Sequence, residues 1–209
     1  MGYSQAMSTG ERRAAPATAK RAAAQAAVLR ATEELLAEGA AFSDLAVERI
    51  AGRAGISRTA FYFHFADKRD LLRALTGEVN ALVHEQAARW LEGDGDPQAQ
   101  LRSALRGTRD LFREHAVLVR AIVEVAAYDD AIAQLWRETV GQLAAAAERR
   151  IELERQRGAS TCADPHATAV ALTWMTERTL YEQVGPQPAV DDDALVEALA
   201  AIWTRAIYG

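Results

Sequence analysis

The residues of this sequence whose types and spacing could do chemistry lie in the segment 46–65, AVERIAGRAGISRTAFYFHF. Phe61 and Phe65 are four residues apart, so they share the inner face of a short predicted helix. The polar side chains left mostly on its outer face, near its leading end, are Arg58, Thr59, Tyr62 and His64. A guanidinium, a hydroxyl, a phenol and an imidazole so placed can hydrogen-bond to base edges and phosphates. The segment therefore predicts recognition of nucleic acid.

Two helices, at about 46–53 and 58–64, must position these side chains. Gly55 lets the backbone turn tightly between them, which a Cβ would hinder. A helical hairpin with no role in DNA binding would need such a turn too, so the glycine alone decides nothing. The aromatic run 61–65 is more informative, since so short a helix needs few buried anchors and spare outward aromatic side chains need a purpose. We therefore predict a helix-turn-helix at about residues 43–66.

The segment IAGRAGISRTAFYFHFADKRDLL closely resembles the DNA-binding signature of the tetracycline-repressor (TetR) family of transcriptional regulators, within a match over about residues 20–75. The resemblance implies an all-helical homodimer that binds double-stranded operator DNA through three amino-terminal helices. It also implies a larger helical part for dimerisation and ligand sensing. The residues assigned to DNA are Ala46, Val47, Ser57, Arg58, Thr59, Tyr62, His64 and Lys68.

Two of these positions carry specific expectations. The family usually has Ser or Thr where this chain has Ala46, as the N-cap of a helix whose leading end meets phosphate. The alanine weakens that helix start by roughly 1 kcal/mol, and Asp44 is a candidate substitute. Lys68, at the start of the next helix, places a charge beside free backbone N–H groups, which suits a phosphate.

The charge of the chain agrees with DNA binding once it is divided along the sequence. The net charge of the 209 residues is −5, which at first argues against a nucleic-acid partner. Residues 1–76 hold eleven Lys/Arg against eight Asp/Glu, whereas residues 77–209 hold thirteen against twenty-one. A phosphate-binding surface needs only local positive charge, and an acidic remainder repels DNA.

Other features of the sequence bear on cofactors, membrane partners and cellular location. The single cysteine, Cys162, excludes an internal disulfide, and no Cys/His cluster suggests a metal, so we expect no cofactor. No apolar run approaches the roughly 20 residues that span a bilayer, so we expect no membrane partner. Residues 1–16 lack the apolar stretch of a signal peptide and are predicted to form a flexible arm that carries Arg12 and Arg13. A reducing cytoplasm is the expected location.

The fold class is predicted to be all-α. Alanine is abundant, glycine and proline lie mainly between segments of helical periodicity, and no stretch alternates as a half-buried strand does. After the arm, we expect a three-helix DNA-binding domain at 17–66 and a roughly six-helix ligand-binding and dimerisation domain at 67–209. The helices are expected at about 17–38, 46–53, 58–64, from Asp67 onward, 97–114, 116–126, 129–157, 164–184 and 191–207.

The carboxyl-terminal domain is similar to that of a mycobacterial member of the family, which has a long, largely apolar tunnel. If the likeness covers the whole chain, aligned positions line a pocket for an apolar small-molecule effector. From the residues alone, large apolar side chains on helix stripes are more often solid core than cavity wall. Where the relative has paired asparagines and a tryptophan, this chain has Thr173, Thr176 and Leu143, which indicates the same class of ligand but a different compound. The expected lining is Leu101, Ala104, Leu105, Thr108, Phe112, Trp136, Val140, Leu143, Thr173, Thr176 and Trp203.

The eighth helix is apolar on two faces, one with Val170 and Trp174 and the other with Leu172 and Met175. A helix that is apolar on both sides must bury both. One face packs within the subunit, and we expect the other to form a homodimer through the last two helices. A fully buried central helix in a monomer is the alternative. Two-fold symmetry would set two recognition helices about 34–36 Å apart, to fit successive major grooves.

The rival class is an all-helical enzyme or small-molecule-binding protein without a DNA function. The four histidines are scattered, with no metal-binding pair on one helix and no glycine-rich phosphate loop, so we expect no catalytic residues. The sequence predicts a transcriptional regulator, a repressor released from its operator by the apolar effector. We expect that molecule to enter between the fifth, seventh and eighth helices and to tilt the fourth.

Overall fold

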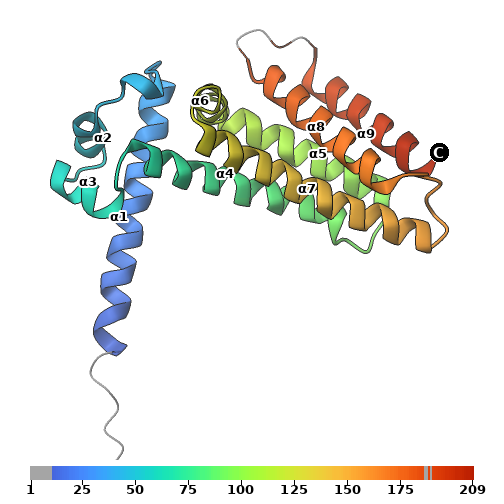
Figure 1. The fold of residues 1–209 in the computed structure, drawn as a ribbon, viewed down its shortest axis with the longest axis horizontal. Coiled ribbons are helices and arrows are strands. Elements are labelled where there is room, and N and C mark those ends of the chain that lie inside the picture. The colour runs from blue at the N-terminus through green and yellow to red at the C-terminus, as the bar shows by residue number, and fades with distance from the viewer. Residues whose placement is uncertain (1–10, 186–187, 189) are drawn as a thin grey trace, which may run out of the picture. The chain divides into compact units, whose positions relative to one another are not determined.

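The computed structural model describes residues 11–185, 188 and 190–209, and all regular structure among them is helical (Figure 1). This confirms the all-α prediction. No described helix is long and apolar enough to cross a membrane. The helices are α1 (Glu11–Ala37), α2 (Val47–Arg53), α3 (Arg58–His64), α4 (Lys68–Leu91), α5 (Pro97–Glu114), α6 (Ala116–Ala126), α7 (Asp130–Gln156), α8 (Pro165–Gln183) and α9 (Asp192–Tyr208), with a short 3-10 helix η1 (Phe42–Asp44) before α2.

Aspartates fix the starts of four of the long helices. Asp96, Asp129, Asp164 and Asp191 each stand at an N-cap, where the carboxylate accepts hydrogen bonds from amides of the first helical turn. Each carboxylate satisfies donors that have no partner within the helix and lies at the positive end of its dipole. Two of these helices also begin with proline, whose missing N–H costs nothing there.

Helix α1 begins earlier than the sequence analysis expects. Its first residue is Glu11 rather than Ala17, so Arg12 and Arg13 belong to the helix and not to a flexible arm. The alanine-rich composition explains the extension, because alanine has the highest helix propensity. The remainder of the predicted arm, residues 1–10, lies outside the described residues, as do the side chains of residues 11–18.

The described residues form two compact units that divide inside α4, the first ending at Leu71 and the second starting at Leu72. In the first unit α1, α2 and α3 pack against one another. Their contact buries Leu35, Ile50 and Phe61, which are 0% exposed. In the second unit α7 packs on α8 and α5 packs on α9.

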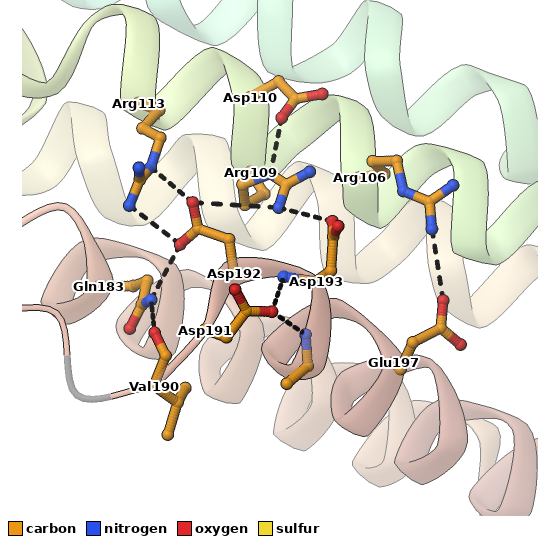
Figure 2. Close-up of polar contacts among 11 residues, drawn as sticks. Arg106, Arg109, Asp110, Arg113, Gln183, Val190, Asp191, Asp192, Asp193 and Glu197 are labelled. Atoms are coloured by element: carbon orange, nitrogen blue, oxygen red, sulfur yellow. Dashed lines mark hydrogen bonds and ion pairs between the residues drawn. The ribbon is translucent and has the colours of Figure 1, made fainter.

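A cluster of charges holds α5 against α9 and the end of α8 (Figure 2). Arg113 Nε lies 2.6 Å from Asp192 Oδ2, and Arg109 Nη1 lies 3.1 Å from Asp193 Oδ1. Gln183, the last residue of α8, donates through Nε2 to Asp192 Oδ1 at 2.9 Å. Asp192 therefore joins three helices at one point, and its side chain is only 18% exposed, so water screens its charge less than at the surface.

A separate ion pair is fully buried near the carboxyl-terminal end of α7. Arg150 Nη2 lies 2.8 Å from Glu154 Oε1, and the two side chains are 4% and 3% exposed. The same guanidinium donates through Nη1 to the carbonyl of Gly93, in the loop between α4 and α5, at 2.8 Å. One arginine thus ties α7 to that loop, and the glutamate supplies its counter-charge.

Removing the counter-charge should destabilise the protein strongly. We expect Glu154→Gln to lower the free energy of unfolding by about 3–5 kcal/mol, because it leaves the Arg150 cation buried without an anion. The matched change Glu152→Gln, on the exposed side of the same helix, should cost within about 0.5 kcal/mol. Urea unfolding followed by circular dichroism measures the free energy of unfolding of both variants. Equal losses in the two would show that the buried pair contributes no more to stability than an exposed glutamate.

Candidate nucleic-acid interface and effector cavity

The amino-terminal unit contains a helix-turn-helix made of α2, α3 and the turn between them. Gly55 in this turn has φ +71°, a conformation that favours glycine. The hydroxyl of Ser57 accepts a hydrogen bond from the Ala60 amide at 3.1 Å and so caps α3. Phe61 (0% exposed) and Phe65 (3% exposed) anchor the helix inward, as their spacing predicts.

The outward face of α3 differs in part from the sequence prediction. Arg58, Thr59 and Tyr62 are exposed, as expected. His64 is half-buried, and its Nδ1 is enclosed without a hydrogen-bond partner among the described residues. Phe63 is the most exposed large apolar side chain of the described residues, at 71%, and the sequence analysis did not assign it to DNA. The signal was present, because a residue two positions from both buried phenylalanines must face the opposite way.

Cations lie against both exposed rings of α3. The guanidinium of Arg21, from α1, lies 5.6 Å from the Phe63 ring centroid, and that of Arg58 lies 5.7 Å from the Tyr62 ring centroid. Arg58 Nη1 also lies 2.8 Å from Glu48 Oε1 of α2, and both side chains are more than half exposed. Contact with Tyr62, followed by the charge of Glu48, raises the pKa of Arg58. The arginine is therefore fully charged, and its exposed ion pair is weak enough to be exchanged for a phosphate or a base.

The amino end of α2 has no side-chain cap. Ala46 is the N-cap residue and makes no capping hydrogen bond, and Val47, which begins the helix, is half-buried. Asp44, the candidate substitute, lies in η1, where its carboxylate accepts a hydrogen bond from the Ser43 hydroxyl at 3.0 Å. The weak helix start inferred from the alanine thus agrees with the structure.

Lys68 makes contacts that the sequence analysis did not foresee. Its Nζ donates to the carbonyls of Phe42, Ser43 and Leu45, at 3.1, 2.7 and 2.9 Å. These three bonds use all the donors of the ammonium group. Burial lowers the pKa of Lys68, and the charge of Asp44 opposes this effect. We therefore assign Lys68 to holding η1 against the start of α4 instead of to a phosphate.

The first turn of α4 is also satisfied from within. Asp67 Oδ1 accepts a hydrogen bond from the amide of Asp70 at 2.8 Å, and Asp70 Oδ2 accepts one from the amide of Ala66 at 3.1 Å. Two carboxylates therefore occupy this helix start in a reciprocal cap. Their negative charge disfavours a phosphate at the position where the sequence analysis placed one.

The carboxyl-terminal unit contains a cavity of about 100 Å³. All eleven residues that the sequence analysis assigned to a ligand pocket line this one cavity, from Leu101 on α5 to Trp203 on α9. Nearly all of the lining is apolar. Such a cavity, with few polar groups, is typical of a site for a small apolar molecule.

Helix α4 contributes a whole wall of the cavity, which the sequence analysis missed. The wall is formed by Asn80, Val83, Ala87, Trp90 and Leu91. The other lining residues that were not predicted are Thr139, Ala147, Glu177 and Leu180. The missed polar residues matter most, because they decide which ligand groups the cavity accepts.

Hydrogen bonds fix the polar side chains of the wall in place. Trp203 Nε1 donates to Thr176 Oγ1 at 2.8 Å, which joins α9 to α8. The Trp203 ring also meets Trp90 edge to face, with centroids 5.4 Å apart. Thr108 donates its hydroxyl proton to the carbonyl of Ala104 at 2.9 Å and so has no proton left for a ligand. The wall is therefore pre-organised.

Comparison with known proteins identifies the family. A model of the bacterial regulatory proteins of the tetR family matches residues 28–75, and a model of the carboxyl-terminal domain of the transcriptional regulator EthR matches residues 101–209. The HTH-type transcriptional regulator EthR of Mycobacterium tuberculosis is 33% identical over 183 residues, which are 86% of this chain and 85% of EthR. The EthR of Mycolicibacterium smegmatis is 31% identical over 188 residues, 88% of this chain and 86% of that protein.

The chain belongs to the TetR family. As a TetR-family protein with an EthR-type carboxyl-terminal domain, it is a DNA-binding transcriptional regulator. Solved structures agree on the fold. NalD of Pseudomonas aeruginosa, the secondary repressor of the MexAB-OprM multidrug efflux pump, has a TM-score of 0.70 at 19% identity and covers 90% of this chain and 98% of its own. SmeT, the repressor of the Stenotrophomonas maltophilia efflux pump SmeDEF, has a TM-score of 0.71 at 20% identity and covers 88% and 90%.

The two roles considered for Lys68 in this TetR-type domain can be separated. We expect Lys68→Met to lower the stability of the amino-terminal unit by about 1–3 kcal/mol, because three carbonyls lose their donor. The slope of log Kd for DNA against log salt should not change. Arg89→Met, at the exposed far end of α4, is the control for loss of one positive charge. A slope reduced by about one unit with unchanged stability would instead identify a phosphate contact.

Proposed function

We propose that this chain is a homodimeric repressor that leaves its operator when a small, largely apolar molecule enters the cavity of the carboxyl-terminal unit. The observation that carries the proposal is the apolar cavity, in a chain whose amino-terminal unit is a TetR-type helix-turn-helix. The efflux-pump repressors that share the fold support the same reading. An operator-binding protein of this kind acts in the cytoplasm. We assign residues 17–66 to DNA binding and 67–209 to ligand binding and dimerisation.

In this proposal α3 enters the major groove, where its exposed leading end meets the bases. Arg58, Thr59 and Tyr62 provide the donors that a groove or a phosphate requires. We add Phe63 and Arg21 as a further contact, since an exposed ring beside a guanidinium offers an apolar surface and a charge at one place. Ser57 positions the helix start, while Lys68 supports the domain from within.

The DNA contact can be tested on the DNA upstream of the protein's own gene. We expect Arg58→Ala to weaken binding by at least about tenfold and to reduce the salt slope by about one unit, because a fully charged and exposed donor is lost. Gel shifts over a range of salt concentrations provide both values. Arg155→Ala, which removes an exposed arginine from the far end of α7, should leave both values unchanged. An unaltered slope in the Arg58 variant would show that this arginine does not touch DNA.

The exposed apolar side chains of α8 and α9 support a dimer through these helices. Val170 and Trp174 of α8 are 36% and 37% exposed, and Ile202 of α9 is 45% exposed. The opposite faces are buried within the unit, for example at Leu172 (6% exposed) and Leu199 (2% exposed). Each helix therefore has an inner apolar face with a partner and an outer one that a second copy would cover.

A charge placed on this outer face should separate the subunits. We expect Ile202→Asp to convert the dimer to a monomer in light scattering, because a carboxylate would be buried at the centre of a two-fold interface without a partner. Leu153→Asp introduces the same charge on an exposed part of α7 and should leave the dimer intact. A dimeric Ile202 variant would place the interface elsewhere.

Helix α4 is the proposed route from the cavity to the DNA-binding domain. It is one continuous helix from Lys68 to Leu91, and its cavity residues begin at Asn80. We infer that a ligand that displaces this wall also moves the start of the helix. The ligand acts only as far as it prefers one α4 position over the other, which for typical allosteric proteins amounts to about 1–3 kcal/mol.

A further inference from the structure

The cavity wall carries buried polar atoms that have no hydrogen-bond partner among the described residues. One of them is a donor, the indole Nε1 of Trp90. Two others, Asn80 Oδ1 and Glu177 Oε2 in its carboxylate form, are acceptors. Buried polar groups without a partner are rare in proteins and need an explanation. A ligand that brings donors would satisfy both acceptors.

The orientation of the Asn80 side chain follows from its neighbour Thr139. The Thr139 hydroxyl donates its one proton to the carbonyl of Leu135 at 3.0 Å. Its oxygen can then only accept from Asn80, so the side of the amide that contacts it must be the NH₂ group. The carbonyl oxygen of Asn80 is therefore the atom left over, and this assignment does not depend on telling nitrogen from oxygen in the amide.

The carboxyl group of Glu177 is fixed in a similar way. The side chain is 8% exposed, and its Oε1 accepts a hydrogen bond from Trp136 Nε1 at 3.1 Å. The indole N–H can only donate, so it holds the carboxyl group in place and leaves Oε2 free. Thr173, one turn earlier on α8 and also part of the wall, has a buried hydroxyl oxygen without a partner. The same side of α8 thus offers a second site for a donor.

The two acceptors are both held by side chains of α7. Trp136 and Thr139, which bind Glu177 and Asn80, are three residues apart on α7 and therefore lie on one face of that helix. Among the described residues that line the cavity, Glu177 is the only acid and none is basic. The electrostatic balance of the wall thus favours a cation and disfavours an anion.

We propose that the effector of this cavity is an amphiphilic amine, with an apolar body that fills the space and an ammonium group that pairs with Glu177 and donates to Asn80. The proposal rests on the effector function proposed above and names the class of that effector. An ammonium group carries several donors, so one such group serves two acceptors. An ion pair with hydrogen bonds in a dry site is stronger than neutral hydrogen bonds to the same atoms.

The titration of Glu177 agrees with this assignment. Burial raises the pKa of Glu177, against smaller lowering effects from Trp136 and from Arg178, and Glu182 raises it slightly. Both Arg178 and Glu182 are exposed on the outer side of α8. Burial thus shifts Glu177 toward its neutral form, and the charge of a bound ammonium group would shift it back toward the carboxylate.

The test uses three probes with one apolar body, which are phenylbutylamine, phenylbutanol and phenylbutanoate. Calorimetric titration of the full-length protein should show the amine binding at least about tenfold more tightly than the alcohol, and the acid more weakly than the alcohol. In Glu177→Gln, one amide oxygen still accepts from Trp136, but an NH₂ group replaces the free acceptor. We expect this variant to lose the preference for the amine and to keep its affinity for the alcohol, which also shows that it is folded.

Glu182→Gln is the matched control, since it removes a carboxylate from the exposed side of the same helix. It should keep the preference for the amine. Equal binding of amine and alcohol to the native protein, an undiminished preference in Glu177→Gln, or no binding of any probe overturns the inference. Release of operator DNA is measured separately by gel shift. If the alcohol releases DNA as well as the amine does, the effector function stands and the amine inference fails. If the amine binds through Glu177 but DNA stays bound, the site is as inferred and the effector function fails.

Discussion

An apolar cavity between its helices is the constraint on which the carboxyl-terminal unit depends. Side chains around an empty space lack dispersion contacts on one side, so the walls tend to collapse unless other contacts hold them. In this unit those contacts lie outside the cavity. The cluster around Asp192 fixes α5 to α9 and to the end of α8, and Arg150 fixes α7 to the loop before α5. Both involve helices that carry cavity residues. Polar contacts thus provide rigidity where apolar packing is incomplete.

The hydrogen bonds within the wall add specificity to this rigidity. Asn80 on α4 is tied to Thr139 on α7, and Trp136 on α7 is tied to Glu177 on α8. Each bond uses one polar atom of the Asn80 amide or of the Glu177 carboxyl group. The remaining oxygen of that group has no partner among the described residues. Such half-satisfied groups are costly in a closed apolar space. A ligand that supplies the missing donors would relieve this cost. Because Asn80 is on α4 and Glu177 is on α8, such a ligand would favour one position of α4 over others.

Sequence reasoning succeeded where the deciding interactions are local or where a family likeness gives positions. Asp129 caps its own helix, Gly55 makes its own turn, and Phe61 and Phe65 share a face by spacing alone. It could not find partners that lie far along the chain. Lys68 next to a helix start suggests a phosphate, whereas the structure shows its donors bound to three carbonyls more than twenty residues away.

The wall on α4 was missed for a related reason. Its side chains have the periodicity of ordinary core residues, and periodicity does not distinguish a packed neighbour from an empty space. Glu177 was missed because its own helix gives no sign that a tryptophan forty-one residues earlier holds it. The family likeness supplied the apolar lining but not the acid within it. Polar groups in apolar pockets thus need a structure before their role can be argued.

The uneven charge of the chain affects small ligands as well as DNA. Residues 77–209 carry thirteen basic against twenty-one acidic residues, and this excess repels the DNA backbone. The same field attracts small cations and repels small anions, so it raises the local concentration of an amine near the unit that would bind it. The excess weakens with added salt, whereas a pair with a buried carboxylate is screened much less. One charge distribution therefore keeps a polyanion at the amino-terminal domain and favours a cation at the other.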